Sequence, residues 1–156
     1  MNKIGGLFLI PFILILVFSC NSDRVFEDYK GMETQSWHIA DTVAFDLPQS
    51  DEAISSLIGI KYNVDYQFRN LYVKYFLSDS LGNKFESQLL NVSLFDSKEG
   101  RPTGAGFGSS YTRFDTLPLQ TKKQFSKIEF VQYMRVEDLK GIEAIGFKQV
   151  EKESDN

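Results

Sequence analysis

Several short stretches of the sequence alternate apolar and polar residues, and this period of two constrains the fold more than any other feature. A strand places alternate side chains on opposite faces, whereas a helix repeats its apolar residues every three or four positions. In "SLIGIKYNV" the residues that share one face are Ile58, Ile60, Tyr62 and Val64. In "NLYVKYFLSD" they are Leu71, Val73, Tyr75 and Leu77. Both stretches therefore predict strands with one buried face.

The same alternation continues along the chain, and turn residues separate the alternating stretches. It places Leu90, Val92 and Leu94 on one face, then Ile128, Phe130 and Gln132, then Ile145, Phe147 and Gln149. "SWHIADTVAFDL" predicts two short strands around residues 40 and 41, and "DSLGNK" predicts a tight hairpin, because Gly and Asn tolerate a positive φ. Many short strands with such turns favour an all-β, antiparallel β-sandwich of the jelly-roll type. The best helix candidate is short, "RVEDLKG" at residues 135–141.

Near the N-terminus, Lys3 is followed by an apolar run that leads up to Cys20, the only cysteine of the chain. The run is shorter than the roughly 20 residues that a transmembrane helix needs, and it is typical of a secretory signal peptide. "VFSC" resembles a lipobox, in which the cysteine is acylated before the signal is cleaved. The sequence therefore predicts lipidation of Cys20, which leaves no thiol for a disulfide or a nucleophile.

The predicted organisation is a single domain behind a lipid anchor. Residues 1–19 are assigned to the lipoprotein signal peptide, 20–35 to the lipidated cysteine and a tether, 36–150 to the β-sandwich, and 151–156 to a disordered tail. Within the tether, Val25 to Tyr29 could pair briefly as a strand.

Charge and the residue after the cysteine bear on location and partners. The net charge is −4 and becomes −5 when the signal peptide, with Lys3, is removed, so nothing favours nucleic-acid binding. An acylated cysteine with several chains anchors a protein stably in a bilayer. Asn21 follows the cysteine in place of the aspartate that signals inner-membrane retention. We therefore expect an outer-membrane lipoprotein, on the periplasmic face.

Residues that carry chemistry are scarce. His38 is the only histidine, so two histidines cannot share a metal ion, and a structural role beside Trp37 is favoured. Five aspartates stand near predicted strand ends or turns, and a pair of them could converge into a glycosidase-like dyad: Asp46, Asp65, Asp79, Asp96 and Asp115. The sequence predicts no catalytic residue, cofactor or metal.

The stretch "RPTGAGFGSSYTRF" holds several glycines and resembles a phosphate-binding loop at first sight. Such a loop opens a helix whose N-terminal amides hold the phosphate. Here the continuation alternates like a strand and lacks Gly-Lys-Ser/Thr. The stretch therefore predicts a connection between strands, which could still contribute to a partner surface.

Aromatic residues are dense in "YQFRNLYVKYF". Alternation places Tyr66, Phe68, Tyr72 and Phe76 opposite the face that holds Leu71 and Val73. These side chains either pack within the sandwich or project as an interaction face, because large aromatics serve both purposes. On the second interpretation the candidate partner-binding residues are Tyr66, Phe68, Tyr72, Phe76, Phe107 and Tyr111.

The order of these landmarks resembles the gliding-motility lipoprotein GldH family of Bacteroidota. The resemblance rests on the cysteine and its short tether, on "SWHIADTVAFDL" and "YQFRNLYVKYFLSDSLG", and above all on "QYMRVEDLKGIEAIGF". It covers essentially the whole mature chain. It implies an outer-membrane-associated lipoprotein connected with gliding and with type IX secretion, without known chemistry, whose partners are other proteins of that apparatus.

Two classes of function remain open. One is a non-catalytic lipoprotein of the gliding and type IX secretion apparatus, which acts through protein–protein contacts and through the membrane at acylated Cys20. The other is a carbohydrate-binding or glycan-processing envelope lipoprotein, since jelly rolls commonly bind sugars and the fold alone does not decide. A sugar binder needs an exposed row of Trp or Tyr, and the chain has one Trp. The sequence favours the first class.

Overall fold

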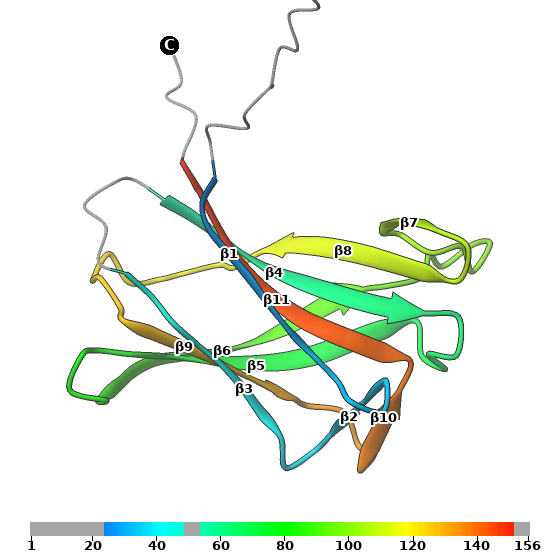
Figure 1. The fold of residues 1–156 in the computed structure, drawn as a ribbon, viewed down its shortest axis with the longest axis horizontal. Coiled ribbons are helices and arrows are strands. Elements are labelled where there is room, and N and C mark those ends of the chain that lie inside the picture. The colour runs from blue at the N-terminus through cyan, green and yellow to red at the C-terminus, as the bar shows by residue number, and fades with distance from the viewer. Residues whose placement is uncertain (1–23, 49–53, 152–156) are drawn as a thin grey trace, which may run out of the picture.

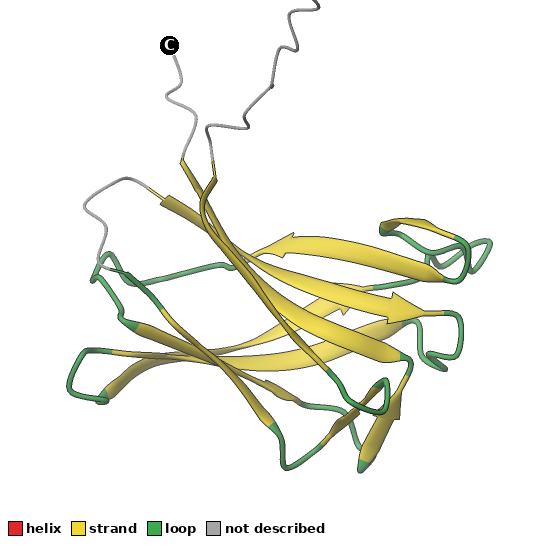
Figure 2. Cartoon of the chain, in the orientation of Figure 1, coloured by secondary structure: helices red, strands yellow, loops and turns green. Residues whose placement is uncertain are grey.

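The computed structural model describes residues 24–48 and 54–151. The signal peptide, Cys20 and residues 152–156 of the predicted tail lie outside the described residues. The strands are β1 (Arg24–Gly31), β2 (Ser36–His38), β3 (Thr42–Asp46), β4 (Ile54–Asn63), β5 (Asn70–Ser78), β6 (Lys84–Ser93), β7 (Ala105–Phe107), β8 (Ser110–Thr116), β9 (Lys127–Gln132), β10 (Asp138–Lys140) and β11 (Ile142–Glu151). The described residues contain no helix (Figure 2), and so none that could cross a bilayer.

Two antiparallel sheets face each other across one core (Figure 1). The first sheet has the order β1-β11-β4-β8-β7 and the second has the order β3-β9-β5-β6, while β2 and β10 form a separate small pair. This arrangement confirms the predicted β-sandwich.

The pairing is nested, which identifies the jelly roll. Outermost in the sequence β1 pairs with β11, then β2 with β10, β3 with β9, β4 with β8, and innermost β5 with β6. The chain is therefore one long hairpin, folded over so that β1–β11 and β4–β8 fall in the first sheet, β3–β9 and β5–β6 fall in the second, and β2–β10 stands apart. The short β7 adds to the edge of the first sheet by pairing with β8. Two further pairings, β4 with β11 and β5 with β9, join the folded hairpin into sheets.

The alternating faces meet in the core as predicted. The face of β5 with Leu71, Val73, Tyr75 and Leu77 is fully buried, and so are Phe130 of β9 and Phe147 of β11. Phe45, Phe130 and Phe147 come from both sheets, and their ring centroids lie 6.1–6.3 Å apart. The hairpin between β5 and β6 also forms as predicted, with Gly82 at φ 84°.

Three expectations need correction. The segment 135–141 is not a helix, because it extends into β10 and its apolar residue Leu139 pairs with the buried Trp37 of β2. Val64 does not share the buried face of β4, since the strand ends at Asn63 and Val64 is 58% exposed. β1 is longer than the brief strand expected within the tether, and it forms the edge of the first sheet against β11.

The sandwich has two ends that differ in the elements they hold. At the termini end β1 begins at Arg24, β4 begins at Ile54 and β11 ends at Glu151, as the pairing register shows. At the far end lie the β4–β5 loop, the β7–β8 hairpin and the β2–β10 pair (Figure 1).

Candidate partner-binding surfaces

The six aromatic residues suggested for partner binding occupy different environments. Phe68, Tyr72 and Phe107 are exposed, and Phe76 is half-buried on the outer face of the second sheet. Tyr66 is buried, and Tyr111 is half-buried against the core. The structure therefore divides the set into surface residues and packing residues.

Tyr66 is a core residue, although the sequence placed it on a candidate interaction face. The alternation of β5 was extended backwards to residue 66, but the strand begins only at Asn70. The Tyr66 ring lies parallel to Phe95, with an interplanar angle of 10°, and its hydroxyl donates to the Asn70 carbonyl at 2.8 Å. Burial raises the pKa of the Tyr66 hydroxyl. This side chain holds the β4–β5 loop in place.

Tyr111 supports the β7–β8 hairpin. Its ring packs against Tyr62, with centroids 6.0 Å apart, and its hydroxyl donates to the Gly108 carbonyl at 2.8 Å. The backbone of this hairpin requires glycine at two positions near Tyr111. Gly108 has φ 67°, and a Cβ on Gly106 would collide with the Ser110 carbonyl oxygen. The glycine-rich stretch is thus a closely packed hairpin that leads into a strand.

An aromatic–lysine strip runs along the outer face of the second sheet. We use this name for Tyr72, Lys74 and Phe76 of β5 together with Tyr133, which follows β9. The Lys74 ammonium lies 5.3 Å from the Phe76 ring centroid and 5.9 Å from that of Tyr133. The Tyr133 amide donates to the Tyr72 carbonyl at 2.8 Å, so the two tyrosines stand on neighbouring backbone. The strip combines ring surface with positive charge.

No side chain or element of the described residues covers the strip. Leu89 of β6 and Val131 of β9 flank Lys74 in register, and Leu89 is exposed. Glu129 is held by Lys84 at 2.7 Å and by Lys127 at 3.8 Å. Among the described residues Lys74 has no carboxylate partner, and no described element packs over this face. An outer sheet face usually carries polar residues, so the apolar ones here indicate an interaction surface.

The far end carries a group of exposed apolar side chains that includes Tyr72 and Tyr133 of the strip. Ten large apolar residues are exposed in the described part of the chain, and six of them lie at this end: Ile39, Val64, Phe68, Tyr72, Phe107 and Tyr133. A shallow hollow of about 440 Å³ lies between Val64, Phe68 and Phe95. The sequence patterns did not indicate that these side chains are exposed: Ile39 lies in a turn, Tyr133 follows the end of β9, and Val64 was assigned to the buried face of β4 although the strand ends one residue before it.

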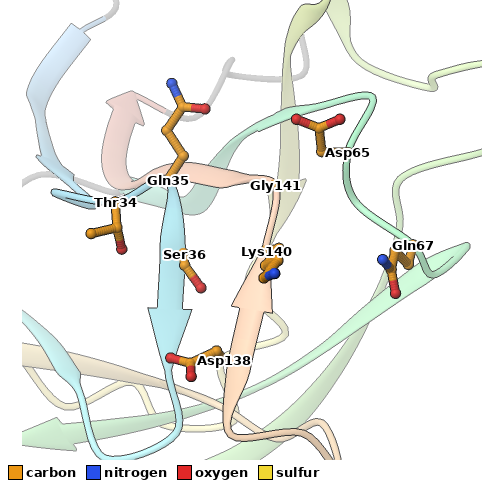
Figure 3. Close-up of a pocket in the computed structure, with 8 residues that line it drawn as sticks. All are labelled: Thr34, Gln35, Ser36, Asp65, Gln67, Asp138, Lys140 and Gly141. Carbon is orange, nitrogen blue, oxygen red and sulfur yellow. The ribbon is translucent and has the colours of Figure 1, made fainter.

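A larger hollow of about 580 Å³ lies nearby and is polar (Figure 3). Asp65 projects from the β4–β5 loop, across from Ser36 of β2 and from Asp138 and Lys140 of β10. The Ser36 hydroxyl oxygen is buried without a hydrogen-bond partner among the described residues. The remaining lining residues are Thr34, Gln35, Gln67 and Gly141. None is aromatic, so the hollow offers no ring on which a sugar could stack.

The carboxylates of the turns serve as hydrogen-bond acceptors. Asp79 accepts the amides of Leu81 and Asn83, and Asp96 accepts those of Lys98, Glu99 and Arg101. These bonds lower the pKa of both aspartates. The general acid of a glycosidase needs the opposite shift. Asp79 and Asp96 are therefore turn residues.

Glu86 and His38 are also engaged in local structure. Burial disfavours the ionised form of Glu86, but hydrogen bonds from the Tyr75 hydroxyl and from the amides of Gln120 and Thr121 outweigh it and lower its pKa. His38 Nδ1 accepts the Ala40 amide at 3.1 Å and shapes the turn before β3. Within the described ranges, no three His, Cys, Asp or Glu side chains gather into a metal site.

Comparison with known proteins gives one consistent result. A family model described as GldH lipoprotein matches residues 24–148. The gliding motility lipoprotein GldH of Flavobacterium johnsoniae is 27% identical to this chain over 97% of its length and 98% of the relative's. A GldH homolog from Christiangramia forsetii is 28% identical over the full length of both. No solved structure matches the chain.

Proposed function

Because the chain belongs to the GldH lipoprotein family, we propose that it is a lipid-anchored, non-catalytic component of the gliding motility machinery that works by binding another envelope protein. Its curated relatives are named gliding motility lipoproteins, and they align over almost their whole length. The proposed anchor is acylated Cys20, in the outer membrane and on its periplasmic face. A contribution to type IX secretion belongs to the same proposal.

One observation carries the binding role: the aromatic–lysine strip lies uncovered on the outer face of the second sheet. Tyr72 is 37% exposed, and Lys74 sits between the Phe76 and Tyr133 rings without an ionic partner among the described residues. Aromatic residues that become buried on binding typically dominate the energy of an interface. An acidic surface with apolar groups would complement this strip.

The non-catalytic part of the proposal rests on what the described side chains already do. The carboxylates of Asp79, Asp96 and Glu86 and the imidazole of His38 are engaged in hydrogen bonds that shape the fold. The sugar-binding alternative rests on the smaller far-end hollow alone, which holds Phe68 and Phe95, since the larger one has a polar lining without an aromatic ring.

The test is copurification of partners from membranes with wild type, Tyr72→Ala and Phe76→Ala. Loss of a central aromatic from an interface costs about 2 kcal/mol or more, so we expect partner recovery to fall by more than tenfold and gliding or secretion to weaken. Tyr29→Ala is the matched control, because Tyr29 is 36% exposed on the outer face of the other sheet.

Circular dichroism establishes that each variant is folded. Undiminished recovery with both folded strip variants would remove this face from the proposal. An equal loss with Tyr29→Ala would show that the effect is not specific to the strip.

A further inference from the structure

Each of the two sheets ends in two edge strands, and β6 is the least protected of the four. An edge strand presents unpaired amides and carbonyls, and proteins usually guard it with charges, a bulge or a short length. β1 has four charged residues among eight and a register shift at its start, β3 has five residues, and β7 has three. β6 has ten residues, carries no charge after Glu86, and exposes Leu89 by 51%. It is therefore the edge most open to another strand.

The outward-facing backbone groups of β6 belong to Ser87, Leu89 and Asn91. In an antiparallel pair, residues whose backbone groups face the neighbouring strand alternate with residues whose groups face away. The Tyr72 carbonyl faces β9, since it accepts the Tyr133 amide, so the residue opposite it in β6, Asn91, faces away from β5. Leu89 and Ser87 follow in steps of two. All three are exposed, and their amides and carbonyls have no hydrogen-bond partner among the described residues.

Two connecting segments touch β6 and bound this free edge. After β6, Thr103 lies beside Ser93, whose carbonyl accepts the Thr103 hydroxyl at 2.7 Å. After β8, the Thr121 amide donates to the Glu86 carboxylate at 2.8 Å. The free edge between them covers residues 87–91, about 16 Å at the rise of a strand. It has room for an extended segment of similar length.

A second copy of this chain does not fit the free edge. If residues 87–91 of two copies paired antiparallel, each β6 would continue past the paired stretch. A residue of one copy would then fall opposite Ser93 of the other, where Thr103 already lies. A short segment that leaves the edge before Ser93 avoids this collision.

The side chain of Arg113 indicates the chemistry of that segment. Arg113 pairs in register with Ile60, which is fully buried, so both side chains point between the sheets. The Arg113 Nε atom is buried without a hydrogen-bond partner, and within the described ranges this side chain forms no ion pair. Asp115 lies on the same face, but its carboxylate accepts the Thr116 amide at 3.0 Å. A buried donor without an acceptor costs free energy, so Arg113 favours a bound segment that carries a carboxylate.

Arg113 lies between the same two segments that bound the free edge. Gly104, which follows Thr103, packs against the Thr112 carbonyl of β8, and Thr121 lies on the connection from β8 to β9. The side of the sandwich formed by β6 and β8 is therefore closed at both ends, with Arg113 and the free edge between the closures.

We infer that a short extended segment of another protein completes β6, pairing with residues 87–91 and carrying an acidic side chain that reaches Arg113. Such strand addition draws affinity from backbone hydrogen bonds and specificity from alternate side chains. An apolar residue on the opposite face of the segment meets the exposed Leu89. The inference rests on the protein-binding role proposed above, although not on the aromatic–lysine strip as its site.

Photocrosslinking in whole cells identifies the occupant. Benzoylphenylalanine is incorporated at position 89 of the full-length chain, and mass spectrometry identifies the crosslinked peptide. We expect a segment of another protein that contains Asp or Glu. The same analogue at position 81 is the matched control, since Leu81 is 85% exposed in a hairpin turn. A crosslink to a second copy, to residues 152–156 of this chain or to lipid would overturn the inference, as would the absence of any crosslinked protein.

Proline variants test the pairing itself, with a synthetic peptide of the crosslinked segment as the probe. Leu89→Pro removes an outward amide and leaves the bonds between β6 and β5, as proline on an edge strand does. We expect it to weaken peptide binding by at least about tenfold. Leu89→Ala keeps the amide and is the matched control, with an expected change below about threefold.

Arg113→Gln tests the acidic contact. We expect it to lower the affinity for the peptide by about tenfold, and an amide in place of the peptide's acidic residue should lower wild-type binding equally. Combined, the two changes should cost little more than either alone. Arg101→Gln is the control, because the Arg101 side chain is 77% exposed. Fully additive losses would contradict the contact.

Circular dichroism checks the fold of each variant, and Ser87→Pro repeats the test at a second outward amide. Peptides N-methylated at alternate amides probe the wild-type protein directly: one set should lose binding and the other should keep it. Equal binding by both sets, or unchanged affinity with a folded proline variant, would overturn the inference. Partner loss with Tyr72→Ala but not with the proline variants would remove strand addition and leave the proposed function in place.

Discussion

Gly141 connects β10 to β11 at a position that strongly favours glycine. Its φ is 83°, and a Cβ there would collide with the backbone amide nitrogen of Tyr66. Gly82 has nearly the same φ, 84°, but has open space around it. A positive φ costs a non-glycine residue about 1–2 kcal/mol, and overpacking adds about 1–3 kcal/mol.

We therefore expect Gly141→Ala to lower the free energy of unfolding more than Gly82→Ala does. Urea denaturation of the two variants and wild type measures the difference. Equal losses would show that the Tyr66 backbone moves aside without cost.

Asp96 makes the stability of the loop after β6 depend on pH. Hydrogen bonds from the amides of Glu99 and Lys98 lower its pKa, so the charged form is favoured in the folded protein. That contribution is present above the ordinary aspartate pKa of about 3.9 and is lost as the pH falls through the lowered value. The difference in melting temperature between wild type and Asp96→Asn should therefore shrink from pH 7 to pH 2. A difference that stays constant would contradict this assignment.

At the level of single residues, alternation predicted burial well inside strands and failed beyond their ends. Phe130 and Phe147 were placed correctly because each has an inward neighbour two positions away. Tyr66 was misplaced because the chain turns between it and Asn70. The exposed Tyr133 and Ile39 belong to no repeating pattern, so the far-end surface could not be read from the sequence.

At the level of elements, the sequence predicted the strands that have one apolar face. It did not predict the extent of strands that are held mainly by hydrogen bonds to a neighbouring strand. β10 has only three residues, and its polar neighbours gave it a helical pattern. β1 is largely exposed, as an edge strand is, and its composition matched a tether. Both are fixed by pairing with strands distant in sequence, β2 and β11. Such pairing leaves little trace in local sequence.

The β2–β10 pair is small, and the fluorescence of Trp37 in β2 can be used to follow its unfolding. Trp37 is fully buried, and its indole N–H donates to the Asp41 carbonyl at 3.0 Å. Because Trp37 packs into the common core, we expect this pair to unfold together with both sheets. Trp fluorescence and far-ultraviolet circular dichroism should then give the same denaturation midpoint. An earlier fluorescence midpoint would identify the pair as a separate unit.

For the whole molecule, the nested pairing follows the order of the strands along the chain, and the proposed attachment to the membrane depends on Cys20. The jelly-roll class was predictable because many short alternating stretches allow few other architectures. The place of β1 at the edge of the first sheet was not, since it depends on pairing with β11 at the other end of the chain.

We expect Cys20→Ala to release the protein from the outer membrane or to mislocalise it, because on our proposal the lipid at Cys20 supplies essentially all of its membrane affinity. Fractionation of cells that carry the variant measures this. If the variant stays quantitatively in the outer membrane without protein partners to hold it, the anchor assignment is wrong.

The antiparallel contact between β1 and β11 has a mechanical consequence. β1 starts at the termini end, and its register with β11 extends from Arg24 to Gly31. A pull applied to the N-terminal end of β1 along the strand loads the backbone hydrogen bonds of this pair in shear. All of them resist together, whereas a sideways pull would open them one after another. The β1–β11 pair is therefore strongest against a pull along β1 and weakest against one at right angles to it.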